Sequence, residues 1–357
     1  MSPRRASLLG GVLLALSGLL LVLGTGVGSA GLENLLPPLL DPSADPAQAA
    51  MARQIVWEIR VPRTLGAWLA GALLGLAGAV AQGLFRNPLA DPYLLGSAAG
   101  ASLGVALALA LTGGAAGMLG GAASRAAIGL ASSSLWVRLG FTGAAFAGAV
   151  LAVLLTLALA RGVQHTLRLL LAGVIVGVVL GGLTSLAMLF SPDSLQAMQA
   201  FMLGSTGFVG WSACTLMALA WGITALAAWA LARALDGLSL GEATAMSLGL
   251  PLVPVRAALV AVVALATGTA VAQTGLIAFV GLAAPHLVRA ALHLPHRQLV
   301  MLASLMGGVL LAAADLLARG LIAPQELPVG VLTAVLGGGY LLWLMHRRGG
   351  LLAGAAR

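Results

Sequence analysis

Three arginines stand where helices of a very apolar chain are expected to meet water. Arg60 and Arg63 are three residues apart at the start of an apolar run, in the segment IRVPRT, so a helix places them on one face. Arg319 lies at another expected helix end. Because a guanidinium binds a carboxylate through two parallel hydrogen bonds, these arginines are suited to docking an acidic partner. The alternative is that they anchor the helix ends at the membrane interface.

A second feature is the short polar segment 236–251, DGLSLGEATAMSLGLP. Ser239 and Glu242 have the S-x-x-E spacing of a capping box, which predicts a helix start, and the glycine and proline at its end predict a stop. A helix of about two turns is too short to cross a bilayer. We expect it to lie on the cytoplasmic face, packed into a groove on a partner or against its own bundle. Its apolar contact residues would be Ala243, Met246 and Leu248.

Other chemistries are excluded by what the chain lacks. All 18 residues in the Lys and Arg total are arginine. A phosphate-binding loop needs its lysine and a Schiff-base enzyme needs a lysine amine, so any ATP hydrolysis would belong to another chain. No Ser-His-Asp, paired-carboxylate or metal-ligand spacing is present. We therefore expect a protein that is not an enzyme, with no metal and no cofactor of its own.

The composition points to a membrane as the surrounding solvent. Hydrophobic residues make up 60% of the 357 residues and charged residues 8%, with a mean hydropathy of +1.06. Soluble domains carry about 25% charged residues. A soluble enzyme, a disordered protein and a nucleic-acid module are therefore excluded, and the net charge of +8 indicates membrane orientation rather than nucleic-acid binding.

About ten apolar segments are long enough to span a bilayer. We therefore expect one all-α, polytopic membrane domain over residues 1–357. When Arg4 and Arg5 are placed inside, the cytoplasmic segments collect most of the arginines, so both termini are expected in the cytoplasm. The expected spans are 8–28, 63–84, 93–112, 141–160, 168–190, 208–232, 256–274, 276–292, 299–318 and 328–346.

Glycines recur at helix-face spacing in two of these spans. Such faces let helix backbones approach closely in lipid, and we expect close packing from the glycines at 71, 75 and 78. For the 168–190 span, with glycines at 173, 177 and 181, a second interpretation is that bare backbone leaves room for a bulky solute along a pathway.

Ionisable groups inside the spans would indicate a carrier driven by an ion gradient. Asp315 is the exception in otherwise uncharged span centres, and Arg319 follows it at the i, i+4 spacing of a local ion pair. This weakens the hypothesis of a secondary transporter but leaves it open. A membrane scaffold with no transport role is a third hypothesis that also stays open.

Several ordered motifs resemble the permease subunits of iron-chelate, haem and vitamin B12 ABC importers, over about residues 55–346. They are RVPRTL at 60–65, GAVAQ at 78–82, NPLADP at 87–92, LLG at 94–96, RLLLAG at 168–173, GEATAMSLGLP at 241–251, GLAAPH at 281–286 and ELPVG at 326–330.

The resemblance implies a homodimer of ten-helix subunits in the bacterial inner membrane. Two cytoplasmic ATPase subunits, which bind ATP and Mg, would dock around Leu240–Leu248, and a periplasmic solute-binding protein would dock on Arg60, Arg63 and Arg319. Asn87 and Leu89 resemble one layer of a cytoplasmic gate and Thr166 and Leu167 the other. A small hydroxyl residue is the family's pattern at the second of the latter positions, so Leu167 departs from it.

The resemblance also implies transport of a metal-containing solute along a weakly binding pathway. Overall likeness favours haem, with a ferric siderophore or vitamin B12 as alternatives. Soft, adaptable contacts are expected from the span 168–190 and the residues after it. These pathway residues are Gly177, Gly181, Thr184, Ser185, Met188 and Met198.

Overall fold

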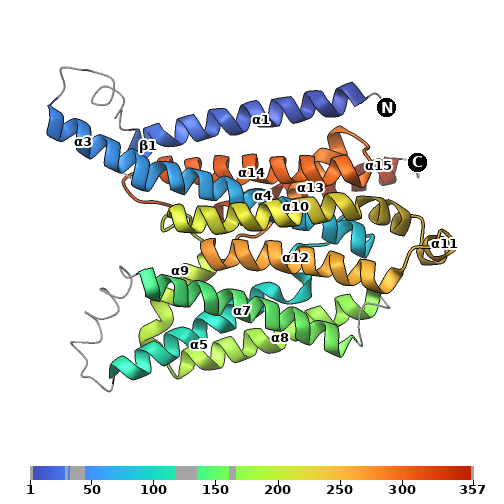
Figure 1. Cartoon of the computed structure of the whole chain (residues 1–357), viewed down its shortest axis with the longest axis horizontal. Coiled ribbons are helices and arrows are strands. Elements are labelled where there is room, and N and C mark those ends of the chain that lie inside the picture. The colour runs from blue at the N-terminus through green and yellow to red at the C-terminus, as the bar shows by residue number, and fades with distance from the viewer. Residues whose placement is uncertain (1–2, 29–30, 33–44, 118–134, 161–165, 355–357) are drawn as a thin grey trace.

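The computed structural model describes residues 3–28, 31–32, 45–117, 135–160 and 166–354. Most helices lie side by side along the long axis of the molecule (Figure 1). The long helices are α1 (Pro3–Gly26), α4 (Val61–Phe85), α5 (Ser97–Gly117), α7 (Leu135–Leu159), α8 (Thr166–Leu189), α10 (Trp211–Ser239), α12 (Leu252–Thr274), α14 (His296–Gly320) and α15 (Val329–Gly354). The short helices are α3 (Pro46–Gln54), η1 (Ile55–Arg60), η2 (Pro92–Leu95), η3 (Pro192–Ser194), α9 (Leu195–Leu203), α11 (Glu242–Ser247) and α13 (Val280–Ala291).

The apolar helices confirm an all-α, polytopic membrane fold. Within the described residues, seven helices are long and apolar enough to cross a bilayer, and α5 and α15 add shorter apolar stretches over 97–111 and 329–343. These nine elements coincide with nine of the predicted spans. One small addition is an antiparallel ladder of two-residue strands, β1 (Val27–Gly28) and β2 (Gly31–Leu32).

The remaining predicted span, 276–292, is wrong in its first residues. Its helix, α13, begins at Val280 and has 12 residues, about 18 Å of helix against a hydrocarbon core of about 30 Å. Phe279 adopts a left-handed φ of 68°, so the helix cannot extend back through this residue. Just before it, the amide of Leu276 donates to the carbonyl of Phe201 at 3.1 Å. The backbone after α9 therefore satisfies part of this unwound segment, which composition alone does not reveal.

Helix α4 occupies the centre of one group of helices and packs against α10, α12, α13 and α14. Its glycines make this closeness attainable, because a methyl group added at Gly78 would overlap the carbonyl oxygen of Gly281, and one at Gly71 would overlap that of Gly307. The predicted packing role of the α4 glycines is confirmed. A second group, α5, α7 and α8, packs together and meets the first mainly through α12.

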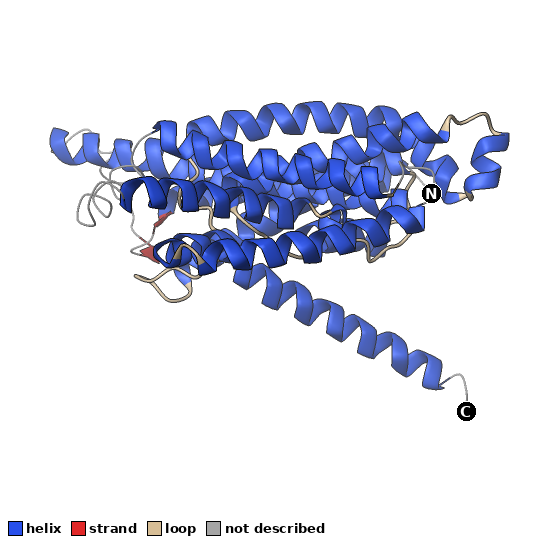
Figure 2. Cartoon of the chain, turned by 90° about the horizontal axis from the view of Figure 1, so that it is seen from below, coloured by secondary structure: helices blue, strands red, loops and turns tan. Residues whose placement is uncertain are grey.

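The two ends of the bundle carry different elements. Helix α1 begins, and α15 ends, at the end that carries α11, whereas α3 lies at the opposite end (Figure 1). We refer to these as the α11 end and the α3 end. Helix α15 also leaves the bundle along its course (Figure 2). Because the first and last long helices begin and end at the same end of the bundle, the arrangement agrees with an even number of membrane crossings.

Candidate transport pathway and coupling surface

A hollow of about 720 Å³ lies between α5, α8, η3 and α9 toward the α3 end. Its volume is within the range of small-molecule sites, about 300–1,000 Å³. None of its twelve lining residues carries an ionisable side chain. They are Ala99, Ser102, Gly181, Thr184, Ser185, Met188, Leu189, Pro192, Leu195, Met198, Met202 and Leu276.

The predicted pathway residues of the span 168–190 gather at two neighbouring hollows. Gly181, Thr184, Ser185 and Met188 line the larger one, together with Met198 of α9. A methyl group added at Gly181 would meet no atom of the described residues within 4 Å, and the same holds at Gly177. Gly177 lines a smaller hollow of about 370 Å³.

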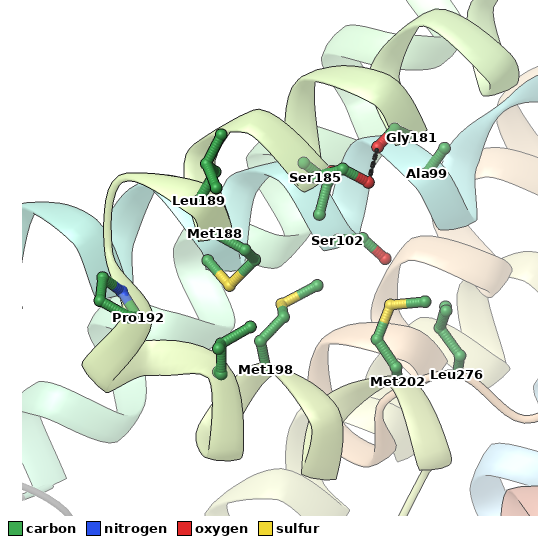
Figure 3. A pocket seen from close by; sticks show the side chains of 12 residues that line it. Ala99, Ser102, Gly181, Ser185, Met188, Leu189, Pro192, Met198, Met202 and Leu276 are labelled. Carbon is green, nitrogen blue, oxygen red and sulfur yellow. Dashed lines mark hydrogen bonds between the residues drawn. The ribbon is translucent and has the colours of Figure 1, made fainter.

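The polar atoms of the larger hollow offer little to a solute. The hydroxyl of Thr184 donates to the carbonyl of Leu180 at 2.9 Å, and that of Ser185 to the carbonyl of Gly181 at 3.1 Å (Figure 3). Two of the three hydroxyl donors that line the hollow are thus already used by their own helix, and Ser102 is the third. A wall of this kind makes mainly dispersion contacts, which are individually weak.

Sequence reasoning missed one of the methionines of this wall. Met202 extends from α9 into the same space as Met198 and lies beside Leu276 (Figure 3). Its spacing of four residues from Met198 was a signal, because residues i and i+4 share a helix face. Ser102 of α5 gave no such signal, since its approach to α8 is a tertiary contact.

The smaller hollow includes Asp91, from the NPLADP segment that also contains the predicted gate residues Asn87 and Leu89. Burial raises the pKa of the Asp91 carboxyl, and the backbone amide of Tyr93, which donates to it at 2.8 Å, acts in the opposite direction. This carboxylate starts η2 and therefore fixes the turn between α4 and α5.

At the α11 end, the predicted short helix is present but its capping box is wrong. Helix α10 continues through Ser239, whose hydroxyl donates to the carbonyl of Asp236 at 2.6 Å. Helix α11 begins at Glu242 after Gly241, which has a φ of 105° and contributes no side-chain cap. Glu242 instead pairs with Arg256 of α12 at 2.6 Å.

Helix α11 projects beyond the bundle (Figure 1) and presents apolar side chains to its surroundings. Leu240, Met246 and Leu248 are each about three-fifths exposed, and Ala243 is exposed as well, whereas Ala245 is fully buried against the protein. The helix therefore packs on the bundle by one face and leaves an apolar face uncovered.

The predicted gate residues lie in two segments near this helix. In the turn after α4, the side-chain oxygen of Asn87 accepts from the backbone amide of Leu89 at 3.0 Å, and the Leu89 side chain is exposed. Thr166 is the first residue of α8, followed by the exposed Leu167. The structure thus brings both segments to the α11 end, as their assignment to a gate requires.

At the α3 end, the predicted docking arginines are engaged within the chain. Arg63 binds Glu326 through two hydrogen bonds of 2.8 Å. Arg319 pairs with Asp315, which confirms the predicted i, i+4 ion pair, and Asp315 also approaches Arg63 at 3.4 Å. Arg60 donates to the carbonyl oxygen of Thr25 at 3.1 Å.

Burial separates these three arginines as docking candidates. Arg60 and Arg319 are 4% and 1% exposed, so their guanidinium groups stabilise the α3 end from within in this conformation. Arg63, with a side chain 11% exposed, and Glu326 are the more accessible pair. The hydrogen bonds from Arg63 lower the pKa of the Glu326 carboxyl.

Comparisons with known proteins agree on one family. The model of the FecCD transport family matches residues 12–347. The vitamin B12 import system permease protein BtuC of Escherichia coli (strain K12 / DH10B) is 40% identical over 296 residues, which cover 82% of this chain and 84% of that protein. BtuC of Salmonella paratyphi A is 39% identical over 300 residues, covering 83% and 85%.

A solved structure agrees with this at the level of the fold. It is described as an inward-facing conformation of an ABC transporter assigned to the metal-chelate type, and it covers 95% of this chain and 99% of its own with a TM-score of 0.77 and 27% identity. Together, the matched family model and the relatives at about two-fifths identity show that the chain belongs to the FecCD transport family.

Proposed function

We propose that this chain is the permease subunit of an ATP-driven importer that moves a bulky, metal-containing solute into the cytoplasm. The observation that carries the proposal is the uncharged hollow along α8 and α9, placed between an exposed coupling helix at one end and an arginine network at the other. In this arrangement the α11 end faces the cytoplasm and the α3 end faces the periplasm. The chain performs no hydrolysis itself.

The exposed face of α11 is the proposed docking surface for an ATPase subunit. Leu240, Ala243, Met246 and Leu248 would enter a groove of that subunit, because an amphipathic helix binds by burying its apolar face. Ser239 is the last residue of α10 and precedes this surface, and Glu242 lies on the side of the surface nearer the bundle. ATP and Mg would be bound in the partner.

The proposed assembly is a homodimer with two ATPase subunits and a solute-binding protein. Helix α15 leaves the bundle (Figure 2) and has exposed apolar side chains at Val335, Leu336 and Leu342. A second copy would cover this helix and close the hollow along α8. Arg63 and Glu326 would meet the binding protein, while Arg60 and Arg319 hold the surface on which it rests.

The solute is proposed from the relatives and from the wall together. The two relatives are named for vitamin B12 and the solved structure for a metal chelate. A corrinoid is therefore the first solute to test, with haem and a ferric siderophore beside it. None of the twelve described lining residues is ionisable. The wall therefore favours a large solute held by weak apolar contacts and argues against a carrier that couples transport to an ion.

Docking on α11 can be tested by co-expressing the chain with a candidate ABC ATPase and measuring ATPase activity of the purified complex in lipid bilayers. Leu240→Glu with Met246→Glu should prevent co-purification, because two charges would enter an apolar groove. Leu321→Glu, at an exposed apolar position of the α3 end, is the matched control and should co-purify normally. Unchanged assembly of the double variant would refute the docking surface.

A further inference from the structure

One carboxylate oxygen at the α11 end joins four segments of the chain. The Oε1 atom of Glu242 lies 2.6 Å from a guanidinium nitrogen of Arg256 and 3.4 Å from one of Arg86. The hydroxyl of Thr166 donates to the same oxygen at 3.3 Å. Glu242 begins α11, Arg256 is in the first turns of α12, Arg86 ends α4 and Thr166 begins α8.

These three contacts differ in strength. Arg256 is 2% exposed and its contact with Glu242, at 2.6 Å, is the shortest of the three, so this contact is expected to persist. Arg86 is 42% exposed and its contact is longer, and exposed pairs of this kind contribute little. The Thr166 bond is also long. Glu242 thus has one firm connection to α12 and two weak ones.

The two weak connections are to the segments that carry the proposed gate. Arg86 immediately precedes Asn87, and Leu89 follows two residues later. Arg86 has a left-handed φ of 50° at the end of α4. Thr166 is itself a gate residue and precedes Leu167. A displacement of α11 by a partner therefore changes the support of both segments at once, while Arg256 keeps Glu242 attached to α12.

We propose that Glu242 is the positioning residue that links the coupling helix to both gate segments, so that nucleotide binding in the partner alters the gate through this carboxylate. The inference rests on the proposed function. It assigns to Glu242, Arg256 and Arg86 a shared role in transmission that differs from contact with the ATPase or with the solute.

The experiment follows the gate directly and needs no solute. Spin labels are placed on cysteines introduced at Leu89 and Leu167, both exposed, in a Cys214→Ala background that removes the single native cysteine. Distances between labels are measured by pulsed electron paramagnetic resonance on the complex with its ATPase in lipid bilayers, without nucleotide and with ATP and vanadate. The transmission variants are Glu242→Gln and Arg86→Asn, since asparagine tolerates a left-handed backbone.

The matched control is Arg233→Gln, which removes an exposed arginine of α10 at the same end of the molecule. We expect ATP to shift the label distances in the parent and control complexes. In Glu242→Gln the shifted fraction, relative to the unshifted one, should fall about tenfold, a change typical of lost coupling between sites. Arg86→Asn should reduce it less. Thr166→Val tests the third contact in the same way.

Two results would overturn the inference. One is an unchanged ATP-dependent shift in Glu242→Gln, which would show that the gate responds without this carboxylate. The other is loss of ATPase binding in both Glu242→Gln and Arg86→Asn, which would make the cluster part of docking or folding. Failure of the parent complex to bind an ATPase at all is distinguishable, because it would refute the proposed function on which the inference rests.

Discussion

Helices α4 and α8 carry similarly spaced glycines but use them in opposite ways. In the most apolar stretch of the continuous helical segment 46–85, which contains α4, 89% is buried within the chain, whereas in that of α8 28% is buried. A methyl group at Gly71, Gly75 or Gly78 of α4 would overlap a carbonyl oxygen of a neighbouring helix. At Gly177 and Gly181 of α8 it would meet open space.

The difference shows that spacing alone does not determine what a small-residue face does. In lipid, close backbone approach is itself a source of stability, since dispersion contacts replace the missing hydrophobic drive. On α4 this approach holds the helix group together. On α8 the same absence of side chains leaves the hollow open. Substitutions of these glycines test the contrast, and a substitution of Glu326 tests a loop contact; they are taken from the largest expected effect to the smallest.

Gly78→Leu should prevent folding, because the added side chain has no space between α4 and α13. Overpacking of a close contact typically costs about 1–3 kcal/mol and occasionally more, and here the obstacle is backbone rather than a flexible side chain. The yield of monodisperse protein in detergent measures the effect. A normal yield and unfolding temperature would show that α4 and α13 separate easily, and the contrast with α8 would fail.

Gly181→Trp should block transport while leaving the fold intact. The indole would fill part of the hollow, so we expect uptake to fall at least about tenfold, a barrier increase of about 1.4 kcal/mol. The free energy of unfolding should change by less than about 0.5 kcal/mol, as at sites without close neighbours. Gly222→Trp, at another open glycine, on α10, controls for the bulk of the indole. Equal loss of uptake in both variants would contradict a pathway beside Gly181.

Helix α8 also contains an internal comparison. Gly173 approaches the carbonyl oxygen of Leu94, whereas Gly177, one turn later, has no neighbour within 4 Å of an added methyl group. Gly173→Ala should therefore destabilise the protein by about 1–3 kcal/mol, and Gly177→Ala should leave stability unchanged or raise it by up to about 1 kcal/mol through helix propensity. Thermal unfolding in detergent distinguishes them, and equal values would remove the distinction between packed and open glycines.

The smallest effect concerns the loop that follows α14, which binds the first turn of α4 at the α3 end. The pKa of Glu326 is lowered by the hydrogen bonds from Arg63, so its contribution to stability is present above the ordinary value of 4.5 and is lost as pH falls through the lowered pKa. Glu326→Gln should lower the unfolding temperature at pH 7. The difference from the parent should shrink as the pH is lowered below 4.5; a constant difference would mean that the pair contributes no charge effect.

Local signals in the sequence were sufficient for some features. Hydropathy predicted nine spans, and the spacing of four residues predicted the Asp315–Arg319 pair. The glycine and proline that follow the short helix near Glu242 predicted where it ends. Each depends on residues that are close in the chain. The gate residues came from resemblance to a family, and the docking residues came from arginine chemistry together with that resemblance. Both sets stay predictions.

Features that depend on tertiary contact were not predictable. Phe279 breaks the helix although its residue type does not favour a left-handed backbone. Arg63 binds Glu326, which is 263 positions away. The capping box failed because α10 extends through Ser239, which left Glu242 free to pair with Arg256. In each case the partner is brought close only by folding.

The most direct test is uptake into proteoliposomes that contain the chain with its ATPase and binding protein. Cyanocobalamin, haem and a ferric siderophore are supplied in turn, and ionophores collapse all ion gradients. We predict that one of them accumulates in the liposome lumen. This accumulation should require ATP on the side of the membrane that carries the ATPase, should persist with ionophores, and should be lost in Gly181→Trp but not in Gly222→Trp. Accumulation that needs an ion gradient and proceeds without the ATPase would contradict the importer, and so would equal uptake by the two tryptophan variants.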